Sequence, residues 1–150
     1  MSIQSQRALM ADIAILLDCD LGYIYGARDG GPNGDKKVFL DKSARFLRAL
    51  AKDLHFAKHR VTKNPAGIAG SGAVSLYGIW NDGNGMYLKI EESCSPSDAF
   101  LYRQIAGIKD YTGNGNQWLP MAIFRAQAYE MLFDILLVQR IKAGDVLNAA

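Results

Sequence analysis

Positively charged side chains are concentrated in one stretch of the sequence, residues 36–63. This stretch has nine Lys and Arg against two Asp, a net charge of +7, so the other residues together carry −5, because the whole chain is +2. If residues 42–63 are wound as a helix at about 100° per residue, their apolar side chains fall on one side. The opposite side then carries a continuous stripe of cations and histidines: Arg45, Arg48, Lys52, His55, His59 and Lys63.

Such a stripe can bind phosphate groups and release their counterions, which gives salt-sensitive binding that depends little on nucleic-acid sequence. It is equally suited to an acidic protein surface. An ordinary amphipathic helix with a solvated outer face would also carry surface cations. A helix face that is only exposed to solvent usually carries both positive and negative side chains, however, and this stripe contains no acid. The stripe therefore favours an anionic partner, either a nucleic acid or an acidic protein.

Two histidines in the stripe raise the question of a metal site. His55 and His59 are four residues apart, and two imidazoles at that spacing on a helix can reach one metal ion. No nearby Glu completes the pattern of a zinc protease, and the neighbouring cations repel a metal. We therefore expect no metal and no cofactor, and we expect these histidines to strengthen anion binding when they become charged below about pH 6.5.

A second candidate site is the polar loop expected at residues 109–119. Its backbone and amide groups can donate and accept hydrogen bonds, and its tryptophan offers a surface for a base, a sugar or a peptide. The residues concerned are Asp110, Asn114, Asn116 and Trp118. The loop lacks the glycine and the glutamate of a calcium-binding EF-hand. It supports an alternative function, a small enzyme or ligand-binding domain, and ordinary turn chemistry also explains its composition.

No motif places a nucleophile, an acid–base pair or a metal in a recognisable catalytic context. The glycine run at 67–72 lacks the ending of a phosphate-binding loop, and no serine stands in a nucleophile elbow. These absences favour a non-catalytic binding protein over an enzyme. A small accessory or inhibitor protein of a mobile genetic element would fit this description.

Three helices are expected to position these residues. The first runs from Ser5 to about Asp20, with Leu9 and Ile13 on its buried face. The second begins at Asp41, a good N-cap, and runs to about Thr62, before Asn64-Pro65. The third runs from Pro120 to Ala143 and is apolar almost all round, which indicates burial or self-association through this helix. Residues 21–27 and 36–40 either form a hairpin, or the first helix continues past Tyr23.

Three strands are expected between the second and third helices. They cover residues 73–80, 85–92 and 99–105, and short turns make them an antiparallel meander. Alternation places Val74, Leu76, Leu88 and Ile90 on a buried face. The other face carries Tyr77, Ile79, Tyr87, Lys89 and Glu91. Three tyrosines of the sheet, Tyr77, Tyr87 and Tyr102, form with Arg103 either an aromatic–cation patch or simple cross-strand pairs.

Length favours one domain, residues 1–150. The order of the expected elements makes it α+β, a three-stranded antiparallel meander packed with about three helices. Hydrophobic residues make up 49% of the chain, enough to form a core without disulfides or a metal. The two cysteines, Cys19 and Cys94, are typical of a reducing compartment. The apolar run Ala8–Leu17 is shorter than the roughly 20 residues that cross a bilayer. We therefore expect a cytoplasmic protein with no membrane association.

Overall fold

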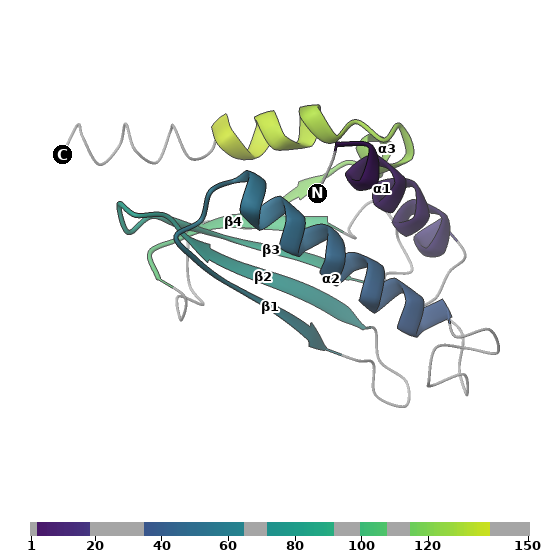
Figure 1. The fold of residues 1–150 in the computed structure, drawn as a ribbon, viewed down its shortest axis with the longest axis horizontal. Helices are drawn as coiled ribbons and strands as arrows, with labels where there is room; N and C mark the ends of the chain where they lie inside the picture. The colour runs from purple at the N-terminus through teal and green to yellow at the C-terminus, as the bar shows by residue number, and fades with distance from the viewer. Residues whose placement is uncertain (1–2, 19–34, 65–71, 92–99, 108–114, 139–150) are drawn as a thin grey trace.

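The computed structural model describes residues 3–18, 35–64, 72–91, 100–107 and 115–138 (Figure 1). Within these ranges the protein is α+β, with an antiparallel sheet and four helices. The labelled helices are α1 (Ile3–Asp18), α2 (Asp35–Asp53) and α3 (Met121–Arg125), and a further helix covers 129–138. The strands are β1 (Lys58–Asn64), β2 (Ala73–Ile79), β3 (Gly85–Glu91), β4 (Phe100–Ile105) and β5 (Gln117–Leu119).

The described strands form one five-stranded sheet in the order β1-β2-β3-β4-β5, and all neighbours are antiparallel. The three expected strands are confirmed as β2, β3 and β4. The expected number of strands was wrong, because β1 and β5 extend the meander at its two edges. Residues 117–119 had been expected in a loop, and they pair with β4 as β5.

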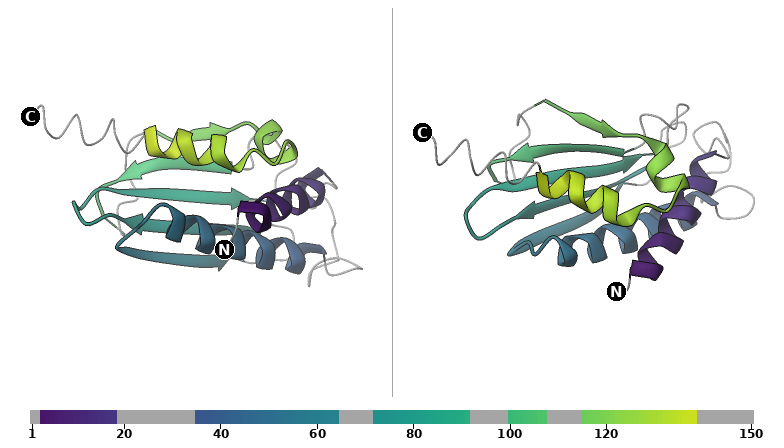
Figure 2. Two further views of the ribbon diagram at one scale, coloured as in Figure 1. Left: turned by 45° about the horizontal axis from the view of Figure 1, so that its top comes forward. Right: turned by 90° about the horizontal axis from the view of Figure 1, so that it is seen from above.

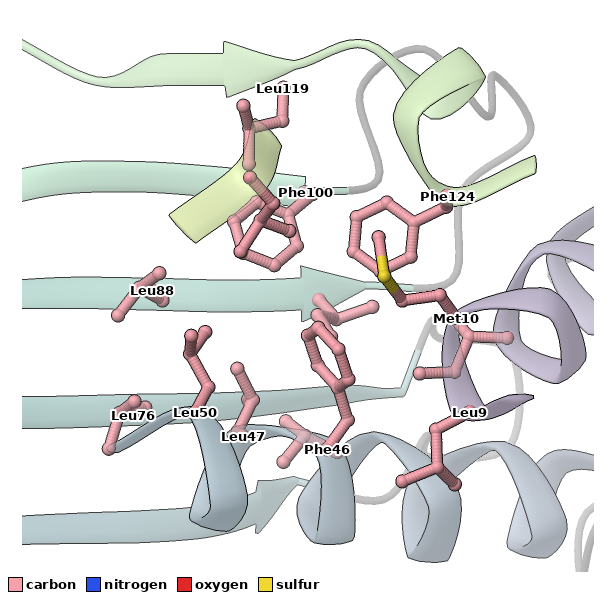
Figure 3. Packing of buried hydrophobic residues seen from close by; sticks show 14 of the residues in the cluster. Leu9, Met10, Phe46, Leu47, Leu50, Leu76, Leu88, Phe100, Leu119 and Phe124 are labelled. Atoms are coloured by element: carbon pink, nitrogen blue, oxygen red, sulfur yellow. The ribbon is translucent and has the colours of Figure 1, made fainter. Parts of the chain in front are cut away.

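The helices pack on one face of the sheet, as the two views of Figure 2 show. Alternation along the strands sends Val74, Leu76, Leu88 and Ile90 towards the helices, and all four are fully buried, as predicted. In the core, Phe46, Leu47 and Leu50 of α2 lie over the sheet (Figure 3). Phe124 of α3 contacts Phe46 and Phe100, with ring centroids 5.7 and 5.3 Å apart.

The second helix differs from its expected limits of residues 41–62 at both ends. It begins at Asp35, so residues 36–40 are helical and the hairpin expected between 21–27 and 36–40 is wrong on its second side; residues 21–27 lie outside the described ranges. It ends at Asp53, because His55 adopts a left-handed conformation with φ 58°. The amides of His55 and Phe56 donate to the carbonyls of Lys52 and Ala51, the hydrogen-bond pattern of a Schellman C-cap.

This cap reverses the chain into β1, so residues 58–64 are a strand and not the last turns of a helix. Phe56 follows the cap and stacks on Trp80, with ring centroids 4.6 Å apart. It lies directly against Gly78, where a Cβ atom would overlap its ring. Trp80 donates its indole N–H to the carbonyl of Leu54 over 2.7 Å. The end of α2 is therefore attached to the end of β2 by packing and by one buried hydrogen bond.

The first helix is confirmed, with Leu9 and Ile13 buried on its inner side. The third helix was expected to be continuous from 120 to 143, and it is interrupted. Gln127 has φ 55°, and the amides of Gln127 and Ala128 donate to the carbonyls of Phe124 and Ile123, so α3 also ends in a Schellman cap. Residues 129–138 form a separate helix with Leu132 and Leu136 buried, and 139–143 lie outside the described ranges.

Candidate anion-binding edge

The outer side of α2 carries three exposed cations, Arg45, Arg48 and Lys52. Together with Asp41 they fall within about 60° of one another on the helix surface. Asp41 is the expected N-cap, but it lies inside the helix and accepts a hydrogen bond from Lys63 of β1 over 2.7 Å. This contact shows that the cationic side of α2 is the side next to β1.

Strand β1 adds further cations beside those of α2. Lys58, His59, Arg60 and Lys63 are all exposed. The hydrogen bond from Lys63, and then its charge, hold the pKa of Asp41 below its usual value of 3.8. We call the surface formed by Arg45, Arg48 and Lys52 of α2 and Lys58, His59, Arg60 and Lys63 of β1 the α2–β1 edge.

Ion pairing distinguishes this edge from four cations elsewhere in the described chain. Arg7, Lys42, Lys89 and Arg125 lie elsewhere, and each faces a carboxylate: Glu130, Asp12, Glu91 and Asp18 respectively. Of the described edge residues, Lys63 alone forms an ion pair, with Asp41. Arg45, Arg48, Lys52 and Lys58 have no carboxylate within ion-pair distance in the described part of the chain. Among the residues that the structure describes, positive charge is therefore left uncompensated at this edge.

The predicted stripe is divided among three elements. Arg45, Arg48 and Lys52 share one side of α2, as expected, whereas His55 lies in the turn and His59 and Lys63 lie in β1. The two histidines are thus not one turn apart on a helix, so the helical spacing considered for a shared metal ion is absent. The prediction missed Lys58 and Arg60. Reading residues 58–64 with a period of two would have placed both on one face of a strand.

A row of stacked side chains crosses the sheet on the face away from the helices. The register pairs Arg60 with Tyr77, Tyr77 with Tyr87, and Tyr87 with Arg103. The Arg60 guanidinium lies 5.3 Å from the Tyr77 ring centroid, and the Arg103 guanidinium lies 4.7 Å from that of Tyr87. Tyr102 is not part of this row, because it points to the helix-covered face and donates its hydroxyl to Gln117 over 3.0 Å.

The alternative polar site is described only in part. Asp110 and Asn114 lie outside the described residues, Asn116 is exposed, and Trp118 of β5 is 49% exposed. Alternation along β5 places Trp118 on the open face of the sheet, opposite Leu101. Because two of its four residues lie outside the described ranges, an enzyme or ligand site at this loop stays a prediction.

A hollow of about 320 Å³ lies at the C-terminal end of α2. It is lined by Asp53, Glu130 and Asp134, by His55, and by the apolar walls of Ile3, Tyr129 and Phe133. The Tyr129 hydroxyl donates to Asp53 over 2.5 Å, and burial, followed by this bond, raises the pKa of Tyr129. Within the described ranges, no three His, Cys, Asp or Glu side chains are arranged to hold a metal ion.

No helix in the described ranges has both the length and the apolar character needed to cross a membrane. Comparison of the chain with models of protein families, with curated proteins and with solved structures found no match. The functional interpretation of the α2–β1 edge therefore depends on its own geometry and charge.

Proposed function

We propose that the protein is a non-catalytic interaction protein that binds an anionic macromolecule, a nucleic acid or a nucleic-acid-associated acidic protein, through the α2–β1 edge. The observation that supports this proposal is the pairing of charges. Arg7, Lys42, Lys89 and Arg125, which lie away from the edge, have carboxylate partners, whereas Arg45, Arg48, Lys52 and Lys58 have none in the described part of the chain. A role as an accessory or inhibitor protein would follow from such binding.

The shape of the edge supports binding to an extended anion. Arg45, Arg48 and Lys52 follow the axis of α2, while Lys58 and Arg60 follow the neighbouring strand. Two roughly parallel rows of cations can contact several phosphates or carboxylates at once, and each contact releases counterions. Binding of this kind is strong at low salt and weakens steeply as salt is added.

The test measures binding of a short DNA duplex and of a single-stranded RNA at several salt concentrations. Arg48→Gln combined with Lys52→Gln should weaken binding about tenfold or more at about 50 mM salt, and should lower the salt slope by about two. The matched control is Arg7→Gln with Arg125→Gln, which removes the same net charge from cations that already have carboxylate partners. This control should change binding much less.

Two results would contradict the proposal. One is the absence of binding to DNA, RNA and a polyacidic protein at low salt. The other is an equal loss of affinity in the edge variant and the control variant, since that would mean that net charge alone determines binding. The fold of each variant is checked by thermal unfolding, because all four side chains are exposed and should contribute little to stability.

A further inference from the structure

Strand β1 is the last strand on its side of the sheet. It spans seven residues, is exposed over most of its length, and pairs with β2 along one side. In the described part of the chain no strand pairs with its outer side (Figure 1). An edge strand presents a row of backbone N–H and C=O groups that can accept another strand. At seven residues β1 offers a longer template than β5, the opposite edge, which has three.

Cations flank this backbone row on both faces of the sheet. Alternation places Lys58 and Arg60 on the open face, and His59 and Lys63 on the face towards α2. Arg48 and Lys52 of α2 add charge above the strand. A second copy of β1 aligned here would bring like charges together, which is destabilising, so the cations prevent pairing between identical edges.

The same cations favour a strand of the opposite charge. We infer that the partner bound at the α2–β1 edge is a protein, and that an extended acidic segment of this partner adds to the sheet beside β1. Main-chain hydrogen bonds to β1 would supply affinity, and acidic side chains on both faces of the added strand would meet the cations. This inference rests on the proposed function, because it names the anion that the edge binds.

The backbone of β1 is the reason for preferring an acidic strand over a nucleic acid. Phosphates can pair with Lys58, Arg60 and the α2 cations, but they match only isolated backbone N–H groups and offer the C=O groups no repeated donor. An added strand pairs with donors and acceptors alternately along the length of β1. It thus uses both the charge of the edge and its backbone.

The test uses two synthetic peptides with one sequence, in which Glu-Glu pairs alternate with Val-Thr pairs over at least the length of β1, so that Glu lies on both faces of the added strand. One peptide has a normal backbone, and the other is N-methylated at every residue, so that neither of its edges can donate to β1. N-methylation keeps every charge but removes the hydrogen-bond donors. Binding to the full chain is measured at low salt, together with hydrogen exchange of the β1 amides; a short DNA duplex is measured alongside.

We expect the normal peptide to bind at least tenfold more tightly than the N-methylated peptide, and to slow exchange of alternate β1 amides. Lys58→Glu should weaken binding of the normal peptide severalfold. Lys89→Gln, which alters a cation paired with Glu91, should leave this binding unchanged. Equal binding of the two peptides, unchanged β1 exchange, or binding of DNA without the peptide would overturn the added strand and leave the proposed function standing. Absence of binding by DNA, by the single-stranded RNA of the first test and by both peptides would overturn both.

Discussion

Tyr77 and Tyr87 stand directly opposite each other on β2 and β3, with ring centroids 4.6 Å apart and ring planes inclined by 36°. The guanidinium groups of Arg60 and Arg103 cover the outer sides of this pair. Four neighbouring strands thus contribute one residue each to a single row. A shift of one residue in any of the three pairings would send a member of the row to the other face, so the row helps to define the register.

Replacing both tyrosines should reveal the interaction between them. In a double-mutant cycle with Tyr77→Leu and Tyr87→Leu, we expect a coupling free energy of about 0.5–1.5 kcal/mol in favour of the native pair. Denaturant unfolding measures it. The control cycle pairs Tyr77→Leu with Tyr102→Leu, whose rings lie on opposite faces of the sheet, and its effects should add. A coupling near zero for the first pair would show that the two rings pack independently.

Stability should fall at alkaline pH because of buried tyrosines. Burial is the main cause that raises the pKa of Tyr87 from 10.0 to about 12. The folded state therefore holds the hydroxyl proton of Tyr87 more tightly than the unfolded state does. The contribution of this proton to the free energy of unfolding is complete below pH 10 and is lost as pH rises towards 12. Tyr87→Phe should flatten the fall in unfolding free energy between these values. An unchanged alkaline profile in this variant would contradict the assignment to Tyr87.

The central strands could be predicted because alternation and turn residues agree there. Val74 and Leu76 alternate with Ser75 and Tyr77, and the turn after Trp80 contains Gly83 at φ 88°. The end of α2 could not be predicted in this way. Leu54, Ala57 and Val61 fit a helical spacing as well as they fit the observed cap and strand, and His55 is not a residue type that announces a left-handed cap.

His55 offers a direct test of that interpretation. A glycine adopts a positive φ without the steric strain of a side chain, so His55→Gly should raise the free energy of unfolding by about 0.5–1 kcal/mol. The matched control is Arg45→Gly in the middle of α2, which should lower it by about 1 kcal/mol. Thermal or denaturant unfolding measures both. A loss of stability in His55→Gly would mean that the imidazole makes contacts worth more than the strain.

The candidate site was predicted in composition but not in geometry. The excess of cations in residues 36–63 is a property of the sequence alone, and it survives the change of residues 58–64 from helix to strand. The carboxylate partners of individual cations could not be predicted, because they come from distant elements: Asp12 of α1 reaches Lys42, and Asp41 of α2 reaches Lys63. Only the folded chain separates compensated cations from uncompensated ones.

Acid should weaken the fold through two exposed carboxylates with lowered pKa values. The pKa of Asp18 is lowered mainly by its hydrogen bond from Arg125, and the pKa of Asp41 mainly by its hydrogen bond from Lys63. Their stabilising contribution is complete above the ordinary value of 3.8 and is lost as pH falls below it. Asp18→Asn with Asp41→Asn should therefore reduce the acid dependence of the unfolding free energy. An identical pH profile in the double variant would show that these pairs do not persist in solution.

Removal of Asp41 should have opposite effects on stability and on binding. Asp41→Asn abolishes an exposed ion pair, which is worth at most about 1 kcal/mol, so the fold should weaken slightly. The same change leaves Lys63 uncompensated near Arg48, another cation that lowers the pKa of Asp41, and we expect tighter binding of a short DNA duplex and a steeper salt dependence. The measurement is a salt titration of binding, with unfolding in parallel.

The matched control is Asp12→Asn, which makes the same change in net charge and also deprives a lysine of α2, Lys42, of its carboxylate at 2.5 Å. Lys42 lies on the side of α2 towards α1, away from β1, because its partner belongs to α1. If the α2–β1 edge is the binding surface, Asp41→Asn should strengthen binding severalfold and Asp12→Asn should strengthen it less. Equal gains in the two variants would mean that the anion responds to the charge of the whole molecule and that the edge has no special role.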